Sequence, residues 1–183
     1  MELLRNLFSH ICGQQHCWTL GGVTVPFCQR CTGLYAGALC ALILIMTFRP
    51  RPRASMYWLH GVFMLVMFPF GFHLVEHGGL VRTFTGALFA FGLVYYFALN
   101  PISVWSAWRP DRGSDVVKYV SLIAVFIALL LASVQWGGAA IAIALAALGT
   151  LGFSTLVILT AANLIVLPGI LQTLLHRSAA PTP

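Results

Sequence analysis

The stretch CTGLYAGALCALILIMTF, residues 31–48, carries no charged side chain. A helix that crosses the hydrocarbon core of a bilayer needs about 20 mostly apolar residues. The stretch is followed by RPRPR, residues 49–53, whose two prolines cannot continue a helix. We therefore predict a membrane-spanning helix over 31–48, and this span decides the fold class of the chain.

The composition of the whole chain agrees with this prediction. Of its 183 residues, 60% are hydrophobic and 8% are charged, whereas a soluble domain carries about 25% charged residues. So few polar side chains cannot cover a water-soluble globule. We predict an integral membrane protein with membrane lipid as its partner. The net charge of +6 is then attributed to membrane topology, because arginine and lysine mark cytoplasmic loops, and no nucleic-acid partner is expected.

Four further apolar segments complete an all-α integral membrane bundle of about five transmembrane helices. The last of them follows Gly137–Gly138 and is too long for one perpendicular span. We predict one long helix, because the alternative of two spans joined by a buried turn leaves costly unpaired backbone in lipid. The predicted spans are 55–75 with a kink at Pro69 and Gly71, 82–99, 118–136, and 139–175 with a kink near Pro168.

The basic residues orient the bundle. The connection at 49–53, the long polar connection at 100–118 and the C-terminal tail hold more arginine and lysine than the connections on the opposite side. The positive-inside rule assigns the richer side to the cytoplasm. We expect an extracytoplasmic N-terminus and two domains, a Cys/His-rich cap over 1–30 and the helical bundle over 31–183.

Four of the five cysteines gather within CGQQHCWTLGGVTVPFCQRC, residues 12–31. Two short pairs separated by a spacer form the pattern of a zinc knuckle, since zinc prefers four nitrogen or sulfur ligands in a tetrahedron. The pair at the start of the first span can supply two ligands, and the upstream cysteines with the neighbouring histidine can supply the others. Gly21–Gly22 allows the chain to reverse between the pairs. The candidate metal ligands here are Cys12, His16, Cys17, Cys28 and Cys31.

Two other interpretations of these cysteines stay open. Extracytoplasmic cysteines tend to be oxidised, so the four can form structural disulfides. A Cys-x-x-Cys at the N-terminus of a membrane helix can also be a redox pair coupled to a quinone, because the helix N-terminus favours the thiolate. Cys40, about 13 Å deeper than Cys31 along the helix, is interpreted as a buried packing residue. His60 on the second span is interpreted as a packing or interfacial histidine.

A second motif, HLVEH at residues 73–77, reproduces the His-x-x-Glu-His pattern of one class of zinc hydrolases. On a helix, His73 and His77 share a face and can bind one metal, and Glu76 can act as general base on a metal-bound water. The third protein ligand would come from the N-terminal segment, for example His10. The alternative is two interfacial histidines and a solvated glutamate.

Arg30 and Arg82 lie on the same predicted side as these motifs. A guanidinium can bind an anionic group such as a lipid phosphate. Each arginine alone is equally well explained by contact with headgroups. Together, beside a metal, they indicate an anionic lipid or lipid-linked substrate.

At CQRCTGLYAG, residues 28–37, the chain resembles an uncharacterised family of small bacterial membrane proteins, a domain of unknown function. The family is marked by Gly-x-x-x-Pro-x-Cys-x-Arg-Cys-Thr-Gly-x-Tyr and by a later Arg-x-x-Thr-Gly. The resemblance covers about residues 12–99, implies a bacterial cytoplasmic membrane, and supports the Cys-x-Arg-Cys cluster as a site without implying a reaction. The matching residues are Gly22, Pro26, Cys28, Arg30, Cys31, Thr32, Gly33 and Tyr35, with Arg82, Thr85 and Gly86.

The chain departs from the family pattern at two places. Upstream of Gly22 it has CGQQHCWTLGG instead of an adjacent Cys-His and a Pro-x-Arg-Ser-Phe stretch. It has HLVEHGG where the family has an acidic and amide-bearing stretch, so His73, Glu76 and His77 are not carried over from the resemblance.

Three functions follow as hypotheses. The first is a zinc-dependent hydrolase that cuts a lipid or lipid-linked substrate at the outer interface, with Glu76 as its base. The second is a thiol–disulfide oxidoreductase that uses Cys28 and Cys31 with a quinone. The third is a non-enzymatic metal-binding protein or accessory subunit.

Overall fold

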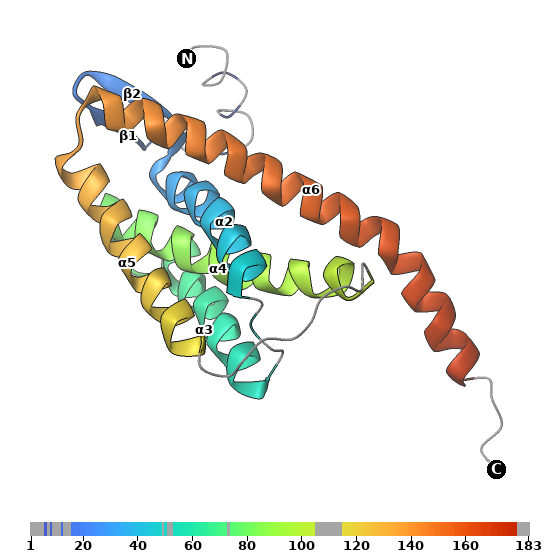
Figure 1. The fold of residues 1–183 in the computed structure, drawn as a ribbon. Helices are drawn as coiled ribbons and strands as arrows, with labels where there is room; N and C mark the ends of the chain where they lie inside the picture. The colour runs from blue at the N-terminus through green and yellow to red at the C-terminus, as the bar shows by residue number, and fades with distance from the viewer. Residues whose placement is uncertain are drawn as a thin grey trace.

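A computed structural model describes residues 6, 8, 12, 16–48, 50, 53–72, 74–104 and 115–178. Five of its helices contain a segment long and apolar enough to cross a membrane, so the predicted all-α membrane bundle is confirmed (Figure 1). The elements are β1 (Cys17–Leu20), β2 (Val23–Cys28), α2 (Gln29–Phe48), α3 (Ala54–Gly71), α4 (Gly79–Val104), α5 (Asp115–Trp136) and α6 (Ala139–Ser178).

Two helix boundaries bear on the sequence predictions. Helix α6 continues through Pro168 to Ser178, so the apolar run after Gly137–Gly138 is one long helix, as predicted. Helix α3 ends at Gly71, four residues before the predicted end, and the backbone N–H of Phe72 closes it by donating to the Phe68 carbonyl. Pro69 lies in its last turn, where a proline favours termination of the helix.

A β-hairpin precedes the first span and was not predicted. Strands β1 and β2 pair antiparallel, with Cys17 opposite Cys28. The predicted chain reversal at Gly21–Gly22 is its turn, because both glycines have positive φ, +54° and +80°, as two-residue hairpin turns require. Strand β2 is buried along its last four residues, so it lacks the apolar–polar alternation that reveals a half-buried strand in a sequence.

The centre of the bundle is the pairing of α2 with α4. These helices pack closely because glycines meet backbone across the interface. A Cβ on Gly33 would overlap the Thr83 carbonyl oxygen, and one on Gly86 would overlap the Arg30 carbonyl oxygen. Small residues permit such an approach between membrane helices. Both helices begin at the same end of the bundle, which we call the cysteine end.

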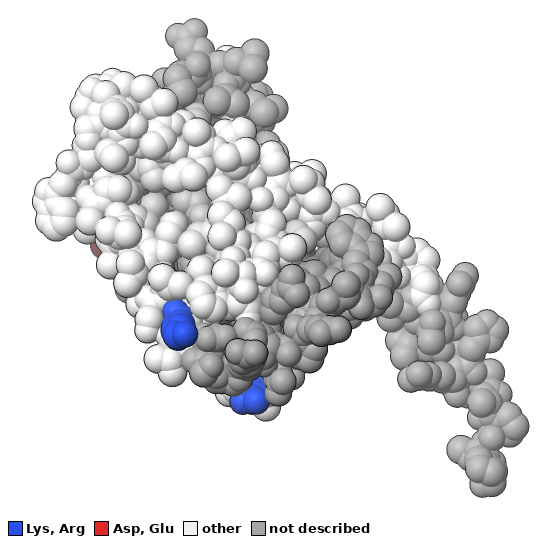
Figure 2. Space-filling view, in the orientation of Figure 1, with Lys and Arg blue, Asp and Glu red and all other residues white. Residues whose placement is uncertain are grey.

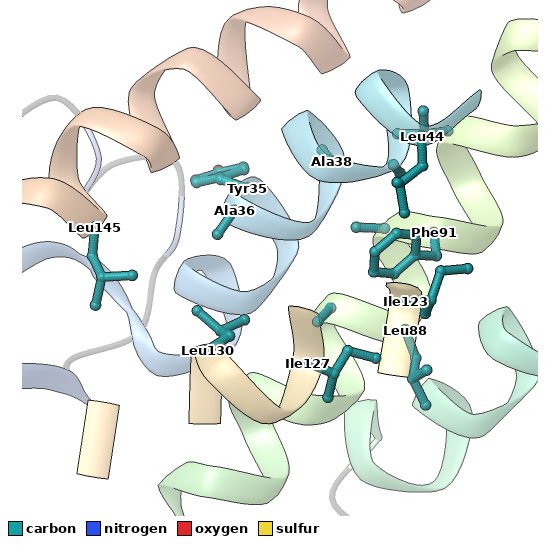
Figure 3. Packing of buried hydrophobic residues seen from close by; sticks show 14 of the residues in the cluster. Tyr35, Ala36, Ala38, Leu44, Leu88, Phe91, Ile123, Ile127, Leu130 and Leu145 are labelled. Carbon is teal, nitrogen blue, oxygen red and sulfur yellow. The ribbon is translucent and has the colours of Figure 1, made fainter. Parts of the chain in front are cut away.

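The remaining elements surround this pair. Helix α6 packs on α2, α4 and the hairpin, whereas α3 packs on α4. Figure 3 shows the apolar core where α2, α4, α5 and α6 meet. Helices α3 and α5 bury few of their residues, 11% and 22% of their most apolar windows. The face drawn in Figure 2 is almost free of charge, with its few basic residues near the starts of α3 and α5. Such an uncharged surface suits contact with lipid.

Candidate metal centre

Three cysteines converge at the cysteine end. Cys12 precedes the hairpin, Cys28 is the last residue of β2, and Cys31 lies in the first turn of α2. Their Sγ atoms all lie within 4.8 Å of one another. The Cys12 thiol donates to Cys31 Sγ at 3.1 Å, and the Cys31 backbone N–H donates to Cys28 Sγ at 3.4 Å. The three thiols are free.

The local fold explains why Cys28 and Cys31 face the same point. Strand β2 passes directly into α2, so the two cysteines are one helical turn apart. The Thr32 hydroxyl donates to the Cys28 carbonyl at 3.1 Å, and the Gln29 backbone N–H donates to the His16 carbonyl at 2.8 Å. The second bond satisfies a backbone N–H that the start of a helix leaves unpaired, and both bonds help to hold the two sulfurs in place.

The electrostatics of the cluster favour one thiolate. Hydrogen bonds from the thiols of Cys12 and then Cys31 lower the pKa of Cys28 well below its usual range. The Cys12 pKa is raised, first because of its hydrogen bond with Cys28. Cys28 is therefore the first of these two to ionise. A thiolate is the form of cysteine that binds metal and that acts as a nucleophile.

Two predicted ligands do not join this group. Cys17 lies opposite Cys28 in the hairpin, and His16 is exposed with its backbone carbonyl bonded to Gln29. Among the described residues, the metal-competent group consists of the three cysteines alone. His10 lies outside the described residues. The three cysteines would supply three of the four ligands of a tetrahedral zinc site.

The HLVEH motif has a different geometry from the one predicted. Because α3 ends at Gly71, residues 74–77 are not helical, so the spacing that would place two histidines on one helix face does not apply to them. His73 lies outside the described residues. The His77 Nδ1–H donates to the Val75 carbonyl at 2.7 Å, and its Nε2 faces Arg30 Nη2 at 3.4 Å. Glu76 is exposed.

Arg30 performs a task that the sequence did not reveal. Its side chain is 8% exposed, and Nη2 donates to the Phe70 carbonyl at 2.8 Å. Phe70 lies in the last turn of α3, where carbonyls lack partners within the helix and where a cation is favourable. Arg30 therefore ties the end of α3 to α2. Arg82, in the first turns of α4, is partly buried. Within the described structure, the Nε atoms of Arg30 and Arg82 are both buried without a hydrogen-bond partner.

A second set of bonds joins the hairpin to the helices. The Trp18 indole N–H donates to the Thr83 hydroxyl at 3.0 Å. The same hydroxyl lies 3.0 Å from the Gln29 carbonyl and 3.1 Å from the Gly79 carbonyl, to which it can donate. One threonine thus links β1, α2 and α4. Sequence reasoning missed this residue, since a lone threonine in an apolar span carries no pattern.

Comparison with known proteins agrees with the membrane assignment. Residues 12–96 match a family described as "Predicted membrane protein (DUF2085)". The resemblance to an uncharacterised membrane protein family is thereby confirmed. The match begins at Cys12, so it includes all three cysteines of the cluster. No match was found among curated proteins or among solved structures.

Proposed function

We propose that this protein binds one zinc ion through the thiolates of Cys12, Cys28 and Cys31. The observation that supports the proposal is the convergence of three sulfurs within 4.8 Å. Zinc–sulfur bonds of about 2.3 Å in a tetrahedron place the sulfurs roughly 3.8 Å apart. One ion therefore fits among them with little rearrangement.

The ion would act as a structural link at the cysteine end. Its ligands come from the segment before the hairpin, from the end of β2 and from α2. Structural zinc contributes to folding because its ligands are not gathered in the unfolded chain. We infer a non-enzymatic role in which zinc ties the N-terminal segment to the bundle.

Hydrolysis of a lipid or lipid-linked substrate would need a base and a substrate site beside this metal. The candidate base Glu76 is exposed. Both ring nitrogens of His77 are engaged, and Arg30 is occupied with the end of α3. These contacts favour metal binding without a hydrolytic role, and we carry the proposal no further than metal binding.

A second candidate function is thiol–disulfide exchange with a quinone. The 3.1 Å separation of the Cys12 and Cys31 sulfurs and the lowered pKa of Cys28 favour it. Two thiols would form one S–S bond and release two electrons and two protons, and the quinone would take up both pairs to become a quinol.

Elemental analysis of the purified full chain separates the two candidates. We expect one zinc per chain, and we expect the thiols of Cys12, Cys28 and Cys31 to alkylate only after the metal is removed. Cys28→Ser should lose the zinc, whereas Cys40→Ser, which alters a cysteine within the membrane span, should retain it. Metal-free protein with a disulfide that quinol reduces would refute zinc binding and establish the redox function.

A further inference from the structure

Helices α5 and α6 diverge from their turn at Gly137–Gly138 (Figure 1). Side chains of both helices line a groove. The groove has a volume of about 210 Å³ and is lined by residues of α5 and α6 with one residue of α2. Its floor consists of Ala36, Leu130 and Leu145, which are all buried and lie near one another in Figure 3. Its rim includes Leu129 and Leu148, which are 65% and 42% exposed. The groove is therefore open sideways, toward the bilayer.

The lining selects a hydrocarbon ligand. Its one polar side chain is Ser133, and no charged residue takes part. The Ser133 hydroxyl already donates to the Leu130 carbonyl at 2.7 Å. The side chains that line the groove offer neither a charge nor a free hydrogen-bond donor with which to bind a phosphate headgroup.

The groove lies within the thickness of one leaflet. Trp136, at the end of α5, is 81% exposed, and exposed tryptophan marks the membrane–water interface. Phe126, at the far end of the groove on the same helix, lies ten residues earlier, which is about 15 Å along the axis. Half of a hydrocarbon core of about 30 Å is the same length.

The groove lies toward the cysteine end of the bundle. The hairpin turn lies against the α5–α6 turn, since a Cβ on Gly21 would overlap the backbone of Ala139. Strand β2 leads from that hairpin turn to Cys28. The groove and the thiol cluster therefore belong to the same leaflet side.

We propose that this groove binds one acyl chain of a bilayer phospholipid from the leaflet at the cysteine end. Its volume admits part of a single chain but not the two-chain body of a phospholipid, and its open rim lets the chain enter from within the membrane. The proposal does not depend on zinc.

The test uses the full chain in phosphatidylcholine vesicles that contain a phosphatidylcholine with a photoreactive diazirine in the middle of one acyl chain. Cross-links should concentrate on groove residues such as Leu129 and Leu148, above the level at Ile143, which is also exposed on α6. Ala144→Phe fills the groove and should lower this cross-linking about tenfold. Ala147→Phe, at an exposed position of α6 outside the groove, should leave it unchanged.

Uniform cross-linking along α5 and α6, or equal cross-linking in the two alanine variants, would overturn the proposal. So would labelling by a diazirine fatty acid with none by the phospholipid probe. If Ala144→Phe does not fold, Ser133→Leu adds apolar volume at the facing wall and serves as the same test.

Discussion

Two of the places where polar side chains gather differ in their bonding. In the thiol cluster, Cys12 donates a hydrogen bond to the Cys31 sulfur, and both sulfurs lie close to that of Cys28. The second place, inside the bundle, surrounds His60, which is fully buried. There Nδ1 donates to the Met56 carbonyl at 2.8 Å, and Nε2 accepts from the Tyr119 hydroxyl at 2.9 Å. The imidazole also stacks on Tyr95 at 3.9 Å.

The contrast shows how to distinguish a ligand site from a satisfied polar group. An ionisable residue within a membrane is a functional hypothesis by default. His60 has a neutral partner on each ring nitrogen, so it joins α3 to α5 and stacks on α4, in agreement with the packing role predicted for it. The three thiols are like groups with weak mutual bonds, and a cation would stabilise them far more than they stabilise one another.

Removing the metal should produce the largest loss of thermal stability. A chelator should lower the Tm of the detergent-solubilised protein by about 10 °C or more, because loss of a tightly bound ligand removes several kcal/mol of stability. The measurement is a thermal melt with and without chelator, followed by zinc restoration. Cys31→Ser should have the Tm that the unmodified protein has in chelator, and chelator should not lower the Tm of this variant further. If chelator still lowers its Tm, the metal is bound elsewhere.

Widening the α2–α4 contact should cause the second-largest loss of stability. Gly33→Ala forces a methyl group against the Thr83 carbonyl and should cost about 1–3 kcal/mol. Because Gly33 is two residues after Cys31, zinc content should also fall. Gly78→Ala is the control, since open space surrounds that position. Equal melting of both variants would show that the helices are less closely packed than described.

Breaking the second polar cluster should have a smaller effect that leaves zinc in place. Tyr119→Phe removes the hydrogen bond to His60 and should destabilise the protein by about 1 kcal/mol. Zinc per chain, measured by elemental analysis, should stay at the unmodified level. Loss of zinc in this variant would link the two clusters and contradict their separation.

Substitutions in the HLVEH segment should have the smallest effect on stability. His77→Ala removes the contact with Arg30 Nη2 and should cost less than about 1 kcal/mol, with zinc retained. Glu76→Gln, at an exposed position, should alter neither stability nor zinc content. Zinc loss in His77→Ala would instead support the motif as a ligand pair.

Patterns that are local in the sequence predicted the corresponding structure well. The five spans follow from apolar runs and their breaks, and Gly21–Gly22 marked the chain reversal. The end of α3 was predicted too late, because residues 72–75 are apolar enough to continue a span and only the termination near Pro69 and Gly71 excludes them. The His-x-x-Glu-His pattern depends on helical spacing, so that boundary also removed its expected geometry.

By itself, the sequence determined that this chain is a membrane bundle with cysteines concentrated at one end. Apolar run length and cysteine spacing are properties of neighbouring residues, which the chain carries into any fold. Tertiary structure alone decided that Cys12 joins Cys28 and Cys31 while Cys17 does not, and that Arg30 bonds the end of α3. These contacts depend on where β2, α2 and α3 meet. Because they join residues that are 16 to 40 positions apart, they leave no local pattern in the sequence.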